Sequence, residues 1–295
     1  MSPESQTKAD QNKKSGAFEC FEVKIENHIA HIRLVRPQVA NAMNMTFWNE
    51  LPAIVKDISD NARARVIVIS SEGKHFTAGM ELSVFGGGAD QSHIEAGRRR
   101  ERMMQTVLML QKTFSCLEEA RMPVLTAIQG ACVGGGMDFV SAADMRYCTK
   151  EAFFSIAEIN IGMTADVGTF PRMGYVMPQG LVREMAFTGR RMLADEAKAC
   201  GFVNEVFASH EAMMDAVMGH AKEIASKSPL AIWGSKEMLN YGRDHSVADA
   251  LKHIAVWQTG MFQPGDMAES FGAQQEKRAP EFQELMPVPK RFEQL

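Results

Sequence analysis

The chain has 295 residues, of which 45% are hydrophobic, and a net charge of -4 with a pI near 6.1. A chain of this size can bury one large core, or one core plus a smaller helical part. This weakly acidic net charge argues against nucleic-acid binding, which normally uses a strongly basic face. No run of 18 uncharged apolar residues is present to cross a membrane. We therefore expect a globular protein with neither a nucleic-acid nor a membrane partner.

The cysteines indicate a reducing compartment. There are five, an odd number, without CxxC pairs or the spacing of a zinc site: Cys20, Cys116, Cys132, Cys148 and Cys200. The N-terminal stretch lacks the apolar segment of a secretory signal and carries acids that transit peptides avoid. These features predict free thiols, no metal site and a cytoplasmic location.

The first part of the chain predicts a polar tail followed by a hairpin and a helix. Residues 1–16 are polar without apolar periodicity, and we expect a disordered tail. Residues 21–25 and 29–34 alternate apolar and polar side chains around a short polar turn, which is typical of a hairpin. A helical pattern follows Pro37, with Asn44 or Thr46 as its N-cap.

The next segments alternate strand and helix patterns. Residues 66–70 form a β-branched run, typical of a strand buried on both faces in a parallel sheet. Residues 94–117 have helical spacing, and a buried strand begins at Pro123 and runs into a glycine run. This order predicts an α/β core over residues 17–205 built from repeated strand–helix units. Residues 206–295 are helical throughout and predict a separate lobe whose Met- and Trp-bearing faces form a subunit interface.

The glycine run Gly134–Gly136 marks the point where a strand becomes a helix. The first N–H groups of a helix have no helical acceptor, and the helix dipole favours negative charge there. Glycine also lets a ligand approach the backbone. The run therefore indicates either a site for a developing oxyanion or close packing of helix on strand. If the loop FTAGMEL lies beside it, the N–H groups of Met80 and Gly135 can bind one oxygen.

Three carboxylates follow the glycines, at Asp138, Glu158 and Asp166. Each alone could be a helix cap or a solvated acid, and for Asp144 we adopt that interpretation. Asp138 differs because bulky apolar residues surround it, which favours chemistry or buried pairing. The basic run from Arg98 to Arg102 is interpreted as a solvated face, with a phosphate contact as the alternative.

From about Phe21 to Lys277 the chain resembles the crotonase (enoyl-CoA hydratase/isomerase) superfamily. The resemblance rests on RPQVANAMN, GKHFTAGMEL, IQGACVGGGMDFVSAADMRYC and FFSIAEINIGMTADVGTFPRMG. ADVGTF and YGRDHSV are most similar to the delta(3,5)-delta(2,4)-dienoyl-CoA isomerases of that family. The resemblance implies a crotonase (ClpP-like) fold of repeated ββα units with a helical C-terminal trimerisation region. A homotrimer or homohexamer is the expected assembly.

The resemblance also assigns roles to residues. It implies that Met80 and Gly135 donate their backbone N–H groups to an oxyanion hole. The implied catalytic acids are Asp138, Glu158 and Asp166, and the implied substrate contacts are Ala42, Ala78 and Gly134. It implies no cofactor other than the coenzyme A that an acyl-CoA substrate carries. The chain departs from the usual family pattern at Ala157 and at Met80–Glu81, but any residue except proline keeps the required N–H.

The implied reaction shifts the double bonds of 3,5-dienoyl-CoA to give 2,4-dienoyl-CoA in fatty-acid β-oxidation. Glu158 is expected to remove the C2 proton, and Asp166 to protonate the distal carbon from an apolar pocket that raises its pKa. Asp138 is expected to tune both, and the roles of Glu158 and Asp166 could be reversed. The alternatives are a 2-enoyl-CoA hydratase and a non-catalytic crotonase-fold binding protein.

Overall fold

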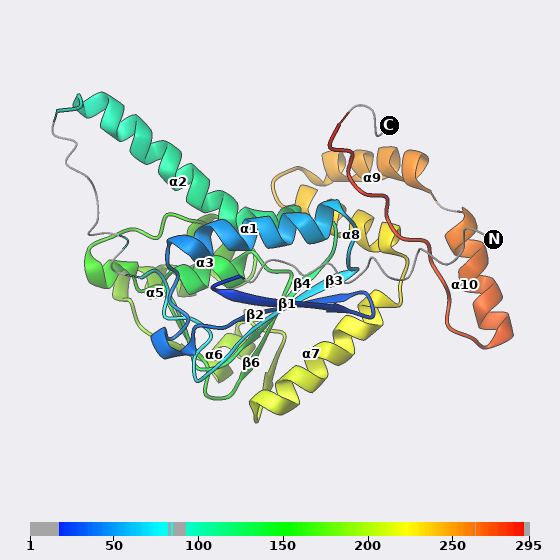
Figure 1. The fold of residues 1–295 in the computed structure, drawn as a ribbon, viewed down its shortest axis with the longest axis horizontal. Coiled ribbons are helices and arrows are strands. Elements are labelled where there is room, and N and C mark those ends of the chain that lie inside the picture. Colours follow the sequence, from blue (N-terminus) through cyan, green and yellow to red (C-terminus); the bar gives the residue numbers. More distant parts are fainter. Residues whose placement is uncertain (1–17, 82–83, 85–92, 263, 292–295) are drawn as a thin grey trace, which may run out of the picture.

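The computed structural model describes residues 18–81, 84, 93–262 and 264–291. The expected tail at 1–16 lies outside these residues. The architecture is mixed α/β with helices at the C-terminal end, as the sequence predicts (Figure 1). Within the described residues, no helix is long and apolar enough to cross a membrane.

A six-stranded sheet forms the centre of the described chain, in the order β1-β2-β3-β4-β6-β9. Its strands are β1 (Phe21–Glu26), β2 (Ile29–Leu34), β3 (Val66–Ser71), β4 (Val124–Ile128), β6 (Met145–Thr149) and β9 (Glu205–Phe207). The predicted hairpin is confirmed as the antiparallel pair β1–β2, and all other pairs are parallel. Every residue of β3 is buried, as its β-branched run predicts.

A smaller sheet of three strands lies beside it, in the order β5-β7-β8. It contains β5 (Ala131–Val133), β7 (Phe153–Ser155) and β8 (Met192–Leu193). The single strand expected from Pro123 into the glycines is therefore wrong, because the chain turns at Gly130 and passes from one sheet to the other. Gly130 has φ 59, and a Cβ there would lie 2.2 Å from the carbonyl oxygen of Lys74. Only glycine fits this turn.

One face of the main sheet is covered by α1 (Met45–Asp60) and α3 (Gly135–Ser141), and the C-terminal end of α2 (Ala96–Glu119) packs against α1 while its N-terminal half projects from the molecule (Figure 1). Asn44 caps α1, as predicted, and its Oδ1 accepts from Phe47 N at 2.9 Å. The ring of Phe139 on α3 lies 5.8 Å from that of Phe47 and 5.3 Å from that of Phe114 on α2. These buried aromatic contacts fix α3 beneath the two longer helices.

The opposite face is covered by α7 (His210–Ala225), which lies below the sheet in Figure 1. Met213, Val217 and Ala221 on this helix pack against Val66 and Val68 of β3. Between β7 and α7 the chain forms η4 (Glu158–Ile161), α4 (Thr169–Met173), α5 (Gln179–Thr188) and α6 (Ala194–Ala199). Gly189, with φ 65, ends α5.

The chain ends in α8 (Pro229–Tyr241), α9 (Val247–Met261) and α10 (Pro264–Glu276). These helices expose large apolar side chains: Leu239 is 74% exposed, Val247 77% and Leu251 62%. Along the described length of α9 no residue is buried. Such an unpaired apolar surface is typical of an interaction site.

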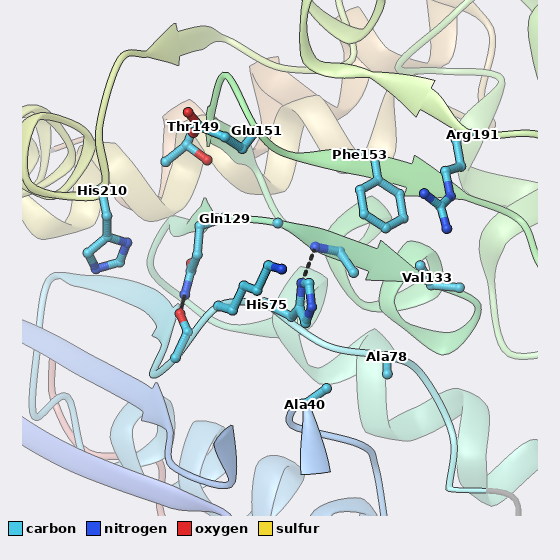
Figure 2. A pocket seen from close by; sticks show the side chains of 14 residues that line it. Ala40, His75, Ala78, Gln129, Val133, Thr149, Glu151, Phe153, Arg191 and His210 are labelled. Atoms are coloured by element: carbon cyan, nitrogen blue, oxygen red, sulfur yellow. Dashed lines mark hydrogen bonds between the residues drawn. The ribbon is translucent and has the colours of Figure 1, made fainter. Parts of the chain in front are cut away.

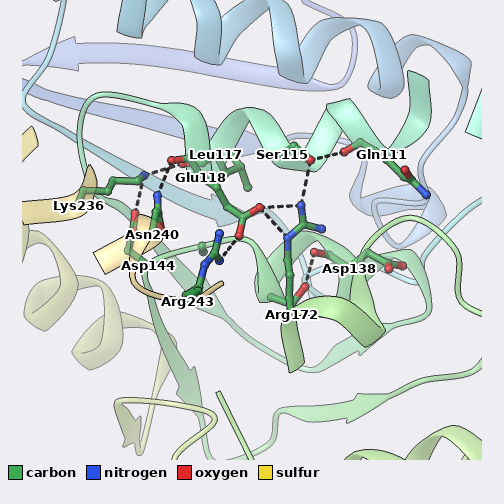
Figure 3. A network of polar contacts seen from close by, with 12 residues as sticks. Gln111, Ser115, Leu117, Glu118, Asp138, Asp144, Arg172, Lys236, Asn240 and Arg243 are labelled. Carbon is green, nitrogen blue, oxygen red and sulfur yellow. Dashed lines mark hydrogen bonds and ion pairs between the residues drawn. The ribbon is translucent and has the colours of Figure 1, made fainter. Parts of the chain in front are cut away.

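Asp144 is exposed, in keeping with the interpretation of this acid as solvated, and it also ties α8 to the main sheet. Its Oδ2 accepts from Lys236 Nζ at 2.8 Å and from Val124 N at 2.7 Å. The Lys236 side chain is only 5% exposed, and Nζ also donates to the carbonyls of Leu117 and Met122. A buried ammonium needs such partners, and the carboxylate supplies the compensating charge (Figure 3).

Candidate active site

The loop after β3 presents the N–H of Met80. Gly79 has φ 87, and its carbonyl accepts from Met43 N at 2.8 Å, while Glu81 N donates to Met43 O at 3.0 Å. Thr77 Oγ1 accepts from Gly79 N at 3.1 Å and donates to Asn41 O at 2.8 Å. These bonds hold the chain on both sides of Met80, and its own N–H has no acceptor among the residues that the structure describes.

The second loop follows β5 and presents the N–H of Gly135. Gly134 has φ 56, and Gly135 is the first residue of α3, where an N–H has no helical acceptor. A Cβ on Gly79 would lie 3.4 Å from Gly135 N, and a Cβ on Gly135 would lie 3.8 Å from Met80 N. Among the described residues, neither N–H donates to a protein acceptor. The two predicted donors therefore lie on adjoining loops, available to one anionic oxygen.

Asp138 lies on α3, about one turn after Gly135, and is 1% exposed. Its Oδ1 accepts from Thr169 N at 2.6 Å and from Thr169 Oγ1 at 2.7 Å. Burial raises the pKa of Asp138 to about 6, although the two bonds from Thr169 act in the opposite direction. The structure thus gives Asp138 the buried, paired environment that its apolar neighbours indicate.

Glu158 begins η4 and faces the glycine run. Its Oε1 lies 3.3 Å from the position that a Cβ on Gly134 would occupy, and its buried Oε2 has no hydrogen-bond partner among the described residues. Burial, followed by the charge of Asp138, raises the pKa of Glu158 to about 7. A carboxyl with this pKa exchanges its proton readily near neutral pH, as an acid–base catalyst must.

Asp166 lies on the loop before α4, and its carbonyl accepts from Gln111 Nε2 at 2.7 Å. The residue is exposed, whereas Ala165 and Val167 on either side are buried. The expected enclosing apolar pocket is therefore wrong for the described chain. The expected direction of the pKa is confirmed, because partial burial raises the pKa of Asp166 above its ordinary value.

The three carboxyls interact electrostatically. The charges of Asp138 and Asp166 both contribute to the raised pKa of Glu158, and the charge of Asp166 also raises the pKa of Asp138. Like charges that share a site raise one another's pKa, so the carboxyls do not all lose their protons at the same pH. Asp138 lies on the helix that begins at Gly135, and Glu158 faces Gly134. No cluster of three metal-ligating side chains occurs in the described part of the chain.

A cavity of about 750 Å³ adjoins the two loops (Figure 2). It is lined by Ala40, Ala78 and Val133 on the side of the oxyanion loops, and by Lys74, His75, Phe153 and Arg191 among others. The Arg191 guanidinium lies 4.3 Å from the centre of the Phe153 ring. Of the predicted substrate contacts, Ala78 lines this cavity, while Ala42 and Gly134 do not. The carbonyl of Ala42 accepts from Arg36 Nη1 at 2.8 Å.

Sequence reasoning missed the residues that hold the site in place. Thr169 binds Asp138 across 31 positions of sequence, and Gln111 binds the loop of Asp166 across 55. Asn41 holds the first oxyanion loop through bonds from Nδ2 to the carbonyls of Glu72 and His75, both 2.9 Å. The spacing of residues along the sequence does not predict these long-range partners. The one local signal was the residue type at position 41, because asparagine tolerates a positive φ and Asn41 has φ 51.

Two backbone donors on adjoining loops and three electrostatically interacting carboxyls are the kinds of group that acid–base enzymes use. Residues 24–285 match the family model described as Enoyl-CoA hydratase/isomerase, and the chain belongs to that family. The predicted resemblance is confirmed.

Several relatives are named as isomerases. The chain is 41% identical over 278 residues to Delta(3,5)-Delta(2,4)-dienoyl-CoA isomerase, mitochondrial, of Mus musculus, covering 93% of this chain and 85% of the relative. It is 35% identical over 270 residues to the peroxisomal protein of that name from Arabidopsis thaliana, covering 91% of this chain and 97% of the relative.

A solved structure supports the predicted fold. The crystal structure of enoyl-CoA hydratase from Bacillus anthracis matches with a TM-score of 0.80 at 26% identity, covering 92% of this chain and all of that one. The expected crotonase fold with C-terminal helices is confirmed.

Proposed function

We propose that this protein is an isomerase that converts 3,5-dienoyl-CoA into 2,4-dienoyl-CoA in fatty-acid oxidation. The observation that carries the proposal is the set of three interacting carboxyls with raised pKa values at Asp138, Glu158 and Asp166. The reaction needs one group to accept a proton and another to donate one at the same pH. Relatives at 35% and 41% identity that are named for this reaction support the assignment.

The proposed first step is removal of the C2 proton by the Glu158 carboxylate. The electron pair of the C2–H bond moves into the thioester, and the resulting oxyanion is bound by the N–H groups of Met80 and Gly135. Losing one such donor in other enzymes costs about 3 to 4 kcal/mol of transition-state stabilisation. The unpartnered Oε2 of Glu158 supports its role as the base, since no protein donor competes for that oxygen among the described residues.

The proposed second step is protonation four carbons further along the conjugated chain. Asp166 donates this proton, and the electrons return from the oxyanion through the chain to form the 2,4-diene. Asp138 holds the pKa of Glu158 high through its charge. No water is added and no group is transferred, so substrate and product have the same atoms. Coenzyme A enters as part of the substrate, and the side chains and backbone supply the chemistry.

We place the coenzyme A part of the substrate in the cavity beside the oxyanion loops. This cavity adjoins the two N–H donors through Ala78 and Val133, and Lys74 and Arg191 supply positive charge for phosphates on its wall. A volume of about 750 Å³ is within the range of cofactor-sized sites. Ala42 and Gly134 remain proposed contacts for the thioester end, outside the cavity.

Assembly and compartment are further parts of the proposal. The exposed apolar side chains of α8 to α10 support a homotrimer or a dimer of trimers. Five free cysteines support a reducing compartment, and we retain the cytoplasm as the proposed location. The relatives' names specify mitochondria and peroxisomes, so cell fractionation is the deciding measurement.

The test is to incubate the protein separately with 3,5-dienoyl-CoA and 2-enoyl-CoA and to follow ultraviolet absorbance. The dienoyl substrate should gain the longer-wavelength absorbance of a conjugated 2,4-dienoyl thioester. The Glu158→Gln variant is the matched control, because the amide keeps the shape and cannot accept the proton. Hydration of 2-enoyl-CoA with no change in the dienoyl compound would instead assign a hydratase. Inactivity on both would favour a binding protein.

A further inference from the structure

We infer that Arg172 is a positioning residue for the loop from Asp166 to Thr169, and that Glu118 on α2 anchors it. The catalytic meaning of this inference rests on the proposed function, because the loop carries one proposed catalytic acid and the threonine that holds another.

Arg172 is attached to α2 by an ion pair with little solvent access. Its Nε donates to Glu118 Oε2 at 2.8 Å, and its Nη2 lies 2.7 Å from the same oxygen. Nη2 also donates to Ser115 Oγ at 3.0 Å, one turn earlier on the helix. The side chains of Arg172 and Glu118 are 12% and 15% exposed. The planar guanidinium is therefore held by two residues of one helix face (Figure 3).

The other edge of the guanidinium lies against the backbone of the loop. A Cβ on Gly168 would lie 1.7 Å from Arg172 Nη1, and Gly168 has φ 140, which side chains rarely adopt. Nη1 also faces the carbonyl oxygen of Val167 at 3.5 Å, at the limit of a hydrogen bond. The arginine thus occupies the space that a side chain at position 168 would need. The next residue, Thr169, binds Asp138.

The same helix holds the start of the loop. Gln111 Nε2 donates to the carbonyl oxygen of Asp166 at 2.7 Å, two turns of α2 before Glu118. The loop is therefore connected to α2 at Asp166 through Gln111 and at Gly168 through Arg172. Because α2 also packs on the aromatic cluster of α1 and α3, the connection ties the loop to the element that carries Asp138.

Glu118 has a second arginine partner, which within the described chain has no hydrogen bond to the loop. Arg243, just after α8, bonds to Glu118 Oε1. Burial raises the pKa of Glu118, but the hydrogen bonds from Arg172 and Arg243 outweigh it, so the pKa lies below its ordinary value. The carboxylate is then ionised near neutral pH and can hold both cations. Arg243 shares the anchor but not the contact with Gly168, which makes it the matched control.

Losing Arg172 should affect turnover more than substrate binding. Neither Arg172 nor the loop lines the cavity proposed for coenzyme A. A displacement of about 1 Å of a catalytic group can lower the rate on the order of a hundredfold. We therefore expect Arg172→Gln to lower kcat by up to about a hundredfold while KM changes by less than about threefold.

The experiment compares Arg172→Gln with Arg243→Gln in kcat, KM, melting temperature and backbone hydrogen exchange of residues 164–172. The expected result is a large fall in kcat and faster exchange of the Thr169 N–H in Arg172→Gln alone. Arg172→Lys keeps the charge and loses the planar guanidinium. Its kcat and its Thr169 exchange rate should therefore lie between those of Arg172→Gln and those of the wild type. If Arg172→Gln does not fold, Arg172→Lys and Ser115→Ala carry the same comparison.

Equal effects of the two glutamine variants on kcat, or unchanged exchange at Thr169 in Arg172→Gln, would overturn the inference. A wild-type protein that leaves 3,5-dienoyl-CoA unchanged would refute the proposed function instead. In that case the exchange measurement still decides whether Arg172 holds the loop, because it needs no substrate.

Discussion

Replacing Thr169 with valine should move the pH dependence of catalysis in a direction that the structure determines. Thr169 Oγ1 donates to Asp138 Oδ1 at 2.7 Å, and both residues are 1% exposed. Valine keeps the branched shape and removes this donor, while the backbone N–H at 2.6 Å remains. The Thr169→Val variant therefore tests one hydrogen bond to one carboxylate.

The size of the effect follows from the charge on the acceptor. A hydrogen bond to a charged group contributes about 1.5 to 3 kcal/mol. Its loss from the ionised form alone corresponds to a rise of about 1 to 2 in the pKa of Asp138. Since that pKa is about 6 in the wild type, Asp138 would remain protonated past neutral pH in the variant.

A protonated Asp138 no longer repels a negative charge on Glu158. The charge of Asp138 is the second cause, after burial, of the raised pKa of Glu158, which is about 7. The pKa of Glu158 should therefore fall in Thr169→Val. Because the proposed base acts as the carboxylate, the acid limb of the kcat/KM profile should move to lower pH.

The assay is kcat/KM for 3,5-dienoyl-CoA from acid to alkaline pH, with Thr169→Ser as the control. Serine retains the hydroxyl and should leave the acid limb where it is. An acid limb that stays in place or moves to higher pH in Thr169→Val would refute the reasoning. It would mean that Asp138 does not control the ionisation of the base.

Three other predictions concern the site and the assembly. Gly135→Pro, which deletes the N–H, should abolish turnover, whereas Met80→Ala should retain most of it; a folded but inactive Met80→Ala would show that its side chain acts. Glu158→Gln and Asp166→Asn should each lower kcat by about 10²- to 10⁴-fold with binding nearly intact. Of these two variants, only Asp166→Asn should still exchange the C2 proton with deuterated solvent. The inverse pattern would make Asp166 the base and Glu158 the acid. Light scattering at micromolar concentration should give a trimer or hexamer, and a monomer would contradict the proposed interface.

Local patterns predicted the parts of the fold that depend on neighbouring residues. The hairpin, the N-cap at Asn44 and the fully buried β3 each follow from residues within a few positions of one another. Asp138 stood out because an acid among bulky apolar residues beside the glycines is costly to bury and therefore informative, whereas the residues alone left Glu158 and Asp166 open to a capping or solvated interpretation. Family resemblance then assigned their roles, which remain proposals.

Long-range contacts were not accessible in this way. Lys236 neutralises Asp144 across 92 positions, and Arg172 reaches Glu118 across 54, so no spacing connects them. The passage from β4 to β5 at Gly130 was hidden because both strands are apolar and periodicity does not reveal which sheet a strand joins. The exposure of Asp166 was visible in principle, since it lies between buried Ala165 and Val167.

The proposed oxyanion hole spans the seam between two sheets, and this has a consequence for inactivation. Gly135 follows β5 of the small sheet, whereas Met80 follows β3 of the large one. Three backbone bonds join the two sides: Phe76 N to Gln129 O at 2.8 Å, Thr77 N to Ala131 O at 3.0 Å and Val133 N to Thr77 O at 3.3 Å.

Among the described residues, these three backbone bonds are joined by four side-chain bonds, from Gln129 Nε2 to Ser71 and Gly73 and from Ala131 N to His75 Nδ1. Because these bonds lie outside the strand pairing of both sheets, we expect the seam to open before either sheet unfolds. In urea, turnover should therefore disappear at a lower concentration than the far-ultraviolet circular dichroism of the chain. Coincident transitions would mean that the two sheets unfold as one unit. The active site would then resist urea as well as the core does. No inactive but folded form would be populated.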